Sequence, residues 1–238
     1  MANDVTKTAT PATTSPLSDG PAILALEDGT VFPGRGFGAA IESAGEIVFN
    51  TAITGYQEVL TDPSYRGQLI TMTAPEIGNV GINQVDFESA RPWCAGFVVR
   101  QVSPTVSSWR SESDLGTFLR EHGIPGIADI DTRAITRRLR DSGAQRAVIT
   151  RDVANPAAAV ERARKHPPLD GRDLVREVTA SEAYTWDEPI WRGTGGAEPF
   201  GDKPAVRHHV VAYDFGIKRG ILRHLRSSGC RVTVVPKS

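Results

Sequence analysis

The sequence predicts an α/β protein built in two parts, and three patterns support this fold class. Residues 22–100 contain short apolar stretches separated by turn signals, which is typical of a mostly β region. From Ser111 onward, apolar residues recur at the spacing of a helix. Residues 210–235 form a strand, helix and strand pattern, and the two strands of such a β-α-β unit are parallel, with a right-handed connection.

The first region predicts a series of short strands. The apolar runs that predict them are residues 23–26, 31–32, 46–50, 68–73 and 96–99. The glycine-rich segment 33–38 resembles a phosphate-binding loop, but such loops lead into a helix, whereas the residues downstream predict a strand. We therefore interpret residues 33–38 as a turn.

Three helices follow, and each has a start signal. They are expected at residues 111–123, 131–143 and 155–167. Ser111 or Ser113 can cap the first helix, and Gly123 can end it. Asp131 caps the second helix and Asn155 caps the third, which also has a proline in its first turn.

Changes in composition divide the chain into segments. The expected segments are a disordered tail (1–20), a first domain (21–186), a linker rich in Pro and Gly (187–206) and the beginning of a second domain (207–238). The last segment holds only two parallel strands, and parallel strands are stable when both faces of their sheet are covered. We therefore expect the second domain to continue beyond Ser238.

The charge balance restricts the classes of partner. Lys and Arg number 27, Asp and Glu number 28, and the formal net charge is -1. Such a balance argues against a protein that coats nucleic acid or an anionic membrane, and no apolar run approaches the roughly 20 residues that cross a bilayer. Residues 133–146 are rich in arginine, but interspersed aspartates and the lack of aromatic residues favour a solvated helix face. We expect no nucleic-acid partner and no membrane partner.

The cysteines and histidines do not form a recognisable site. Cys94 and Cys230 form no disulfide framework, which fits a reducing compartment and predicts a cytoplasmic location. A nucleophilic cysteine of an α/β fold lies on a tight strand-to-helix turn between small residues, and neither cysteine has that context, so we interpret both as buried structural thiols. No histidine has a partner visible in the sequence, and neither Cys-x-x-Cys nor His-Glu-x-x-His occurs, so no metal site is predicted.

Residues 50–65 form the densest polar stretch of the sequence. Within it, Asp62, Pro63 and Ser64 predict a turn with proline at its second position, and a serine there is more often a turn residue than a ligand. The chemistry of these residues alone assigns the stretch no function.

This stretch and several others resemble the small subunit of glutamine-hydrolysing carbamoyl-phosphate synthetase, in order and at the spacing of that family. Examples are Leu-Glu-Asp-Gly-Thr at 26–30, Thr-Gly-Tyr-Gln-Glu at 54–58 and Thr-Asp-Pro-Ser-Tyr at 61–65. The other matching strings are residues 45–51, 78–81, 128–133 and 211–216. The resemblance extends from about Ala22 to the last residue.

The resemblance implies a fold and an activity. The implied fold is an N-terminal β/β/α swivelling-type domain followed by the first β-α-β unit of a flavodoxin-like class I glutamine amidotransferase domain. In that family the amidotransferase domain cleaves glutamine through a cysteine thioester, with a histidine as base and a glutamate that orients it. Ammonia then passes through an internal tunnel to the large subunit, which joins it to bicarbonate.

The implied partners are therefore L-glutamine and the large subunit. ATP and Mg²⁺ are used by the large subunit, so no cofactor is expected in this chain. The product, carbamoyl phosphate, feeds arginine and pyrimidine biosynthesis.

Ser64 is the one functional residue that the resemblance carries over, because it matches a serine that helps bind glutamine in the family. A hydroxyl suits that role, since it both donates and accepts hydrogen bonds. Catalytic residues are expected beyond Ser238, and Cys230 matches a structural position, so the 238 residues alone are expected to be inactive. The alternative is a non-catalytic docking protein for the large subunit.

Overall fold

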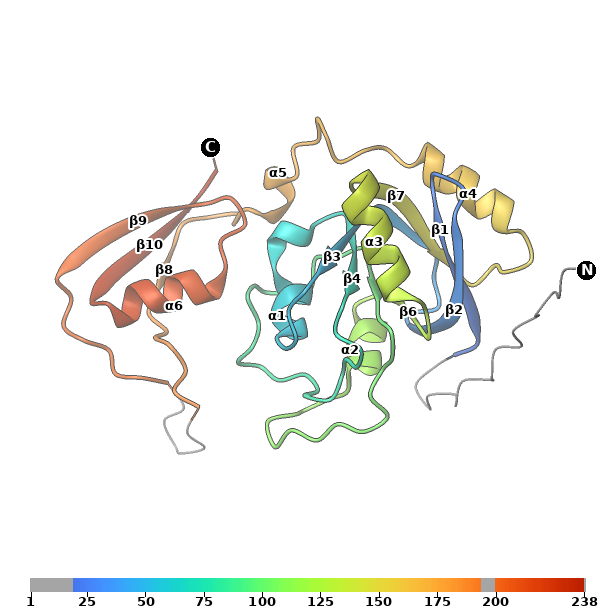
Figure 1. Ribbon diagram of the computed structural model, residues 1–238. Helices are drawn as coiled ribbons and strands as arrows, with labels where there is room; N and C mark the ends of the chain where they lie inside the picture. Colours follow the sequence, from blue (N-terminus) through green and yellow to red (C-terminus); the bar gives the residue numbers. More distant parts are fainter. Residues whose placement is uncertain (1–18, 194–199, 238) are drawn as a thin grey trace, which may run out of the picture.

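The structure is a computed structural model that describes residues 19–193 and 200–237. It has a closed β-barrel surrounded by helices and a smaller sheet beside the barrel (Figure 1). This arrangement confirms the prediction of a mixed α/β protein. Most of the expected tail (1–20) and residues 194–199 of the expected linker lie outside the described residues.

Seven strands close the barrel in the order β1-β2-β6-β5-β4-β3-β7. Their bounds are β1 (Pro21–Leu26), β2 (Val31–Gly38), β3 (Ser43–Asn50), β4 (Gln68–Met72), β5 (Gly96–Val98), β6 (Pro125–Ala128) and β7 (Gln145–Thr150). The series β3, β4, β5 and β6 is parallel, and the other neighbours pair antiparallel. The barrel confirms the mostly β first region, with a strand at each of the expected positions, while the swivelling-type description stays a prediction.

The interpretation of residues 33–38 as a turn is wrong, because they form most of β2. The glycines serve close packing there. A Cβ on Gly34 would lie 2.6 Å from the carbonyl oxygen of Ala128, and a Cβ on Gly36 would lie 2.3 Å from the guanidinium carbon of Arg151. Glycine inside a strand therefore marks a close approach of neighbouring groups, which the sequence alone does not distinguish from a turn.

Helices cover the outside of the barrel. Their bounds are α1 (Tyr56–Thr61), the 3-10 helix η1 (Pro63–Tyr65), α2 (Leu115–Glu121), α3 (Thr132–Ser142), α4 (Pro156–Lys165) and α5 (Val175–Val178). The three predicted helices correspond to α2, α3 and α4, and Asp131 and Asn155 cap α3 and α4 as predicted. The cap of α2 is Asp114, whose carboxylate accepts a backbone N–H at 2.9 Å, so its assignment to Ser111 or Ser113 is wrong. Helix α1 is absent from the sequence-based prediction.

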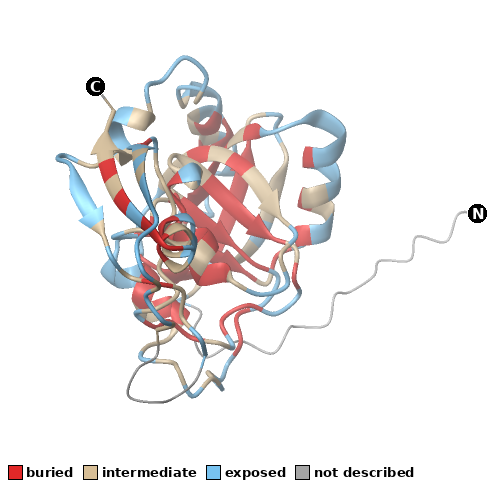
Figure 2. Ribbon diagram, turned by 90° about the vertical axis from the view of Figure 1, so that its left-hand side faces the viewer, coloured by how far each residue is buried: buried red, intermediate tan, exposed pale blue. Residues whose placement is uncertain are grey.

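The core lies in the barrel wall and under the helices, as the buried strands in Figure 2 show. Successive side chains of a strand point to opposite faces, so neighbouring residues join different hydrophobic clusters. Ile70 of β4 packs in the cluster that includes α1 and α2, whereas Leu69 packs in the cluster that includes α3. Helix α4 covers a third cluster through Ala159 and Val160. The helices are thus held by apolar contacts to the strands.

Replacing Asp131 by alanine is expected to lower the free energy of unfolding by about 1 kcal/mol, the usual loss for an N-cap residue. Asp131 Oδ1 accepts the Ala134 N–H at 3.0 Å, and alanine leaves that donor without its partner. Urea unfolding measures the change. Asp141→Ala is the control, because Asp141 is exposed at the other end of α3; an equal loss in both variants contradicts a capping role for Asp131.

The second sheet has three strands in the order β8-β10-β9. The bounds are β8 (Tyr184–Trp186), β9 (His208–Asp214) and β10 (Cys230–Pro236), with α6 (Arg219–Ser227) between β9 and β10. Strands β9 and β10 are parallel, which confirms the predicted β-α-β unit. Strand β8 precedes the expected linker but pairs antiparallel with β10. The domain boundaries and the flavodoxin-like description stay predictions.

Candidate functional site

Ser64 lies in η1, between α1 and β4, so the predicted turn is confirmed. Asp62 caps this turn, because its Oδ1 accepts the Ser64 N–H at 2.9 Å. The Ser64 side chain is exposed, and its hydroxyl makes no hydrogen bond with the described part of the chain. The hydroxyl is therefore free to meet a ligand while the backbone that carries it is fixed.

The Ser64 turn lies against the loop that joins β9 to α6. Lys218 Nζ is 3.3 Å from Asp62 Oδ2, and a Cβ on Gly216 would lie 3.0 Å from the Cβ of Pro63. Gly216 has a φ of 92°, a conformation that residues with a side chain rarely adopt, so the backbone and the close contact both favour glycine there. Ser64 thus lies where the barrel meets the second sheet.

Asp214 fixes the loop beside Ser64. It is buried, and its Oδ1 accepts the N–H groups of Gly216 and Ile217, both at 2.9 Å. Its Oδ2 accepts the Ala180 N–H at 2.8 Å, which joins the end of β9 to the segment after α5. One carboxylate therefore satisfies three backbone donors and holds the loop in one conformation.

Glu88 makes a second hydrogen-bonded contact between the barrel and the part of the chain that forms the second sheet. Its Oε2 accepts the Gly220 N–H at 2.8 Å, and its backbone oxygen accepts the Arg219 N–H at 2.8 Å. Lys218, the residue before α6, provides no side-chain cap of its own. A carboxylate at the first turn of a helix satisfies free N–H groups and interacts favourably with the helix dipole. The N-terminus of α6 is therefore capped by a residue of the segment between β4 and β5.

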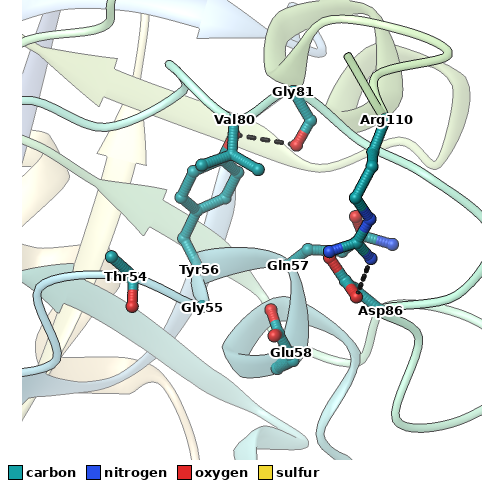
Figure 3. Close-up of a pocket in the computed structure, with 9 residues that line it drawn as sticks. All are labelled: Thr54, Gly55, Tyr56, Gln57, Glu58, Val80, Gly81, Asp86 and Arg110. Atoms are coloured by element: carbon teal, nitrogen blue, oxygen red, sulfur yellow. Dashed lines mark hydrogen bonds and ion pairs between the residues drawn. The ribbon is translucent and has the colours of Figure 1, made fainter. Parts of the chain in front are cut away.

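A cavity of about 180 Å³, which we call the α1 pocket, opens beside the N-terminus of α1 (Figure 3). Arg110 forms an ion pair with Asp86 at one side of it, and the Tyr56 hydroxyl donates to the Gly81 carbonyl at 2.8 Å. Glu58 makes no ion pair within the described ranges. The Glu58 carboxylate is thus the charged group of this pocket that lacks a counter-charge in contact.

Burial raises the pKa of Glu58, and the negative charges of Asp86 and Glu88 raise it further, while a hydrogen bond from its own backbone and the charge of Arg110 lower it. A carboxylate in such surroundings is stabilised by a positive or hydrogen-bond-donating group. The α1 pocket therefore favours a cation or a donor over an anion.

Replacing Glu58 by glutamine is expected to raise the free energy of unfolding at neutral pH. The folded state raises the pKa of Glu58, so ionisation of this group costs stability above the raised pKa, and the cost disappears as the pH falls through it. The difference between the variant and the parent should therefore shrink on acidification. Urea unfolding at several pH values measures it.

Glu182→Gln is the control for this substitution, because Glu182 is exposed and makes no ion pair in the part of the chain that the structure describes. It should leave the free energy of unfolding unchanged at neutral pH. A Glu58→Gln protein that is less stable than the parent at neutral pH would contradict the penalty from burial.

Cys94 and Cys230 are buried and unbonded, as predicted. Burial raises the pKa of the Cys94 thiol to about 12, and a thiol of that kind supplies almost no nucleophilic thiolate at neutral pH. Residues 19–193 and 200–237 contain no group of three or more His, Cys, Asp or Glu that could hold a metal ion. In the same ranges, no helix is long and apolar enough to cross a membrane.

No motif in the sequence points to Asp86, Glu88 or Arg110, because their partners are distant in sequence. Asp86 meets Arg110 through folding of two loops, and Glu88 meets α6 more than a hundred positions away. Glu58 is the last residue of the family string Thr-Gly-Tyr-Gln-Glu at 54–58. The feature that distinguishes Glu58 is its carboxylate, which stands between the buried residues Gln57 and Val59 in α1.

Residues 24–149 match the family model described as carbamoyl-phosphate synthase small chain, CPSase domain. This match covers the β-barrel and more than half of the 238 residues. The chain therefore belongs to the carbamoyl-phosphate synthase small chain family, which confirms the resemblance seen in the sequence.

Individual relatives agree with this family. The carbamoyl phosphate synthase small chain of Syntrophotalea carbinolica is 54% identical over 215 residues, covering 90% of this chain and 57% of the relative. The Escherichia coli K12 protein of the same name is 50% identical over 216 residues, covering 90% and 56%. The chain thus spans little more than half the length of these curated relatives. A solved aminopeptidase from Aneurinibacillus sp. strain AM-1 covers 92% of this chain and 49% of its own, with a TM-score of 0.33 and 10% identity, too low to indicate a shared fold.

Proposed function

We propose that this chain acts in glutamine-dependent synthesis of carbamoyl phosphate, as part of the glutaminase subunit that delivers ammonia to a large subunit. Membership of the small chain family and about half-identical relatives support this activity. In this proposal the large subunit uses ATP and Mg²⁺ to join ammonia to bicarbonate, for arginine and pyrimidine biosynthesis. The subunit works in the cytoplasm, and its partners are L-glutamine and the large subunit.

Delivery of ammonia within the complex has a chemical reason. Ammonia released into neutral water takes up a proton and loses the lone pair that attacks carbon. A protected route keeps it as a nucleophile until it reaches the large subunit. This reason favours an assembly in which glutamine hydrolysis and synthesis take place in bound subunits.

The glutamine-binding part of the proposal rests on the environment of Ser64. Its exposed hydroxyl has no partner among the described residues, and Asp62 and Pro63 hold its backbone in place. The polar groups of glutamine need partners that donate and accept, and a serine hydroxyl does both. The position of Ser64 at the contact with the second sheet suits a ligand bound between the two parts.

The nucleophile that cleaves glutamine is proposed to lie outside these 238 residues. Cys94 is buried with a raised pKa, and Cys230 is buried at the start of β10, so neither is accessible for attack on a substrate. Neither cysteine of the sequence stands in a Gly-x-Cys-x-Gly motif, which would form the tight turn expected of the family's nucleophile. Hydrolysis of glutamine therefore depends, in this proposal, on an amidotransferase domain that continues beyond Ser238.

The second candidate is a non-catalytic docking protein for the large subunit. The family model matches residues 24–149, which include none of the second sheet. A docking protein requires a stable complex with the large subunit that makes carbamoyl phosphate from ammonia and not from glutamine. The two candidates thus differ in the nitrogen source that the complex can use.

Replacing Ser64 by alanine is expected to raise the KM for glutamine by about three- to tenfold, as loss of one neutral hydrogen bond predicts. The subunit as its gene encodes it is combined with the large subunit, and carbamoyl phosphate formation is measured with glutamine and then with ammonia. The KM for ammonia should not change, because ammonia bypasses the glutamine site. Ser142→Ala is the control, since Ser142 is also exposed but lies at the end of α3.

An unchanged KM for glutamine in the Ser64→Ala protein would contradict the role of Ser64. A parent complex that makes carbamoyl phosphate from ammonia but not from glutamine would support the docking protein instead. Failure to form a complex with the large subunit would contradict both candidates.

A further inference from the structure

A second cavity, of about 350 Å³, lies beside one end of the barrel, and we call it the basic pocket. It is lined by residues at or just before the N-terminal ends of the parallel strands β3 to β6, such as Ala44, Gly67, Ala95 and Ile124. Parallel strands begin at the same end of a sheet, so these segments come together there. Neither Ser64 nor any residue of the α1 pocket lines this cavity.

Positive side chains dominate the basic pocket. Arg66, Arg91 and Arg172 all line it. Glu177 is the carboxylate paired with two of them in the described structure, at 2.6 Å from Arg66 and 3.6 Å from Arg172. The guanidinium of Arg91 lies 3.9 Å from the ring centre of Trp93 and forms no ion pair in the described ranges. Three guanidinium groups therefore share one carboxylate, which leaves an excess of positive charge.

Two histidines add hydrogen-bonding groups. His122 Nδ1 is 2.9 Å from the carbonyl oxygen of Phe118, and because a carbonyl only accepts, this nitrogen carries the proton. Its Nε2 makes no hydrogen bond within the described ranges. Burial lowers the pKa of His166, and the positive charges of Arg172 and Arg146 lower it further. Both arginines therefore oppose a positive charge on His166 when no anion is present.

We propose that the basic pocket binds a small phosphate-bearing anion. Guanidinium groups match the geometry of phosphate oxygens and form charge-assisted hydrogen bonds with them. The cavity of about 350 Å³ falls within the size range of small-molecule sites and exceeds what inorganic phosphate alone occupies. Because the positive groups surround a cavity and do not form an extended surface, they fit a small molecule better than a nucleic-acid strand.

Titration calorimetry tests the proposal with two probes, inorganic phosphate and ribose 5-phosphate, at constant ionic strength set by sodium chloride. Saturable binding of one probe per chain is expected. Tighter binding of ribose 5-phosphate assigns the site to phosphate esters, and equal affinity assigns it to inorganic phosphate. The proposal is overturned if neither probe gives saturable heat. It is also overturned if titration of sodium chloride alone gives the same heat as titration of the probes.

Arg91→Gln and Arg172→Gln are each expected to raise the Kd about tenfold or more, as loss of a charge-assisted hydrogen bond predicts. Arg140→Gln is the matched control, because Arg140 is exposed on α3 and does not line the pocket. Arg91 is exposed and unpaired with any described carboxylate, so its replacement breaks no described salt bridge. A Kd that both pocket variants leave unchanged contradicts the proposal.

The imidazole signal of His166 gives an independent reading in the parent protein. A bound anion offsets the charges of Arg172 and Arg146, so the pKa of His166 should rise when ribose 5-phosphate is added. Sodium chloride at the same ionic strength should cause a smaller rise. Equal shifts with both salts would show screening alone and would overturn binding in the pocket. This readout is independent of glutamine hydrolysis, so its failure leaves the proposed function untouched.

Discussion

Replacing Phe97 by alanine is expected to lower the free energy of unfolding by about 3–5 kcal/mol, the usual loss for a buried phenylalanine. Phe97 has no solvent exposure and packs in the cluster that includes α1 and α2. Its strand, β5, pairs with β4 on one side and β6 on the other. Because these pairings hold the strands in place, the barrel cannot close around the cavity that alanine leaves.

Urea unfolding followed by linear extrapolation measures this loss. Phe215→Ala is the control, because it removes the same atoms from a side chain that is 62% exposed. The control should change the free energy of unfolding by no more than about 0.5 kcal/mol. A loss at Phe97 as small as that of the control would contradict a rigid barrel core.

Replacing Asp214 by alanine is expected to destabilise the second sheet by about 3 kcal/mol or more, since each backbone donor left unpaired costs about 1–3 kcal/mol. The carboxylate accepts three backbone N–H groups, from Ala180, Gly216 and Ile217. Alanine removes both carboxylate oxygens and so leaves all three backbone donors without their acceptor. Amide hydrogen exchange should therefore become faster in β9 and α6, while the barrel strands keep their protection.

Asp214→Asn is the matched variant for this experiment. An asparagine keeps one oxygen that accepts from Gly216 and Ile217, but its NH₂ group cannot accept the N–H of Ala180. Its effect should lie between those of the parent and of Asp214→Ala. Equal effects of the two substitutions would contradict the role of Asp214. So would a loss of protection in the barrel strands as large as the loss in β9 and α6.

The sequence by itself predicts α3, α4 and the β-α-β unit because their signals are local. Asp131 and Asn155 are capping residues next to apolar residues at helical spacing, and such a signal needs no distant partner. The turn that carries Ser64 follows from Asp62 and Pro63 in the same way. The family also follows from the sequence, because its matching strings are uninterrupted runs of residues.

Sequence signals fail where a distant contact decides between two local conformations. The glycines of residues 33–38 are compatible with a turn, but Ala128 and Arg151 approach them closely and require a strand with small residues. Helix α1 has only six residues, and its buried face, which includes Tyr56 and Leu60, is stabilised by packing against the barrel. Short helices depend on such tertiary contacts, because their own hydrogen bonds do not offset the cost of nucleation.

The sequence determined the family, the β-α-β unit, the main helices and Ser64 as a candidate site residue. Only the tertiary structure decided that the strands close into a barrel, that Glu88 caps α6, and that Arg66, Arg91 and Arg172 meet in one pocket. The physical reason is the range of the interactions. Turns, caps and periodicity act between residues a few positions apart, whereas closure of the barrel and convergence of charges join residues whose sequence separation carries no signal.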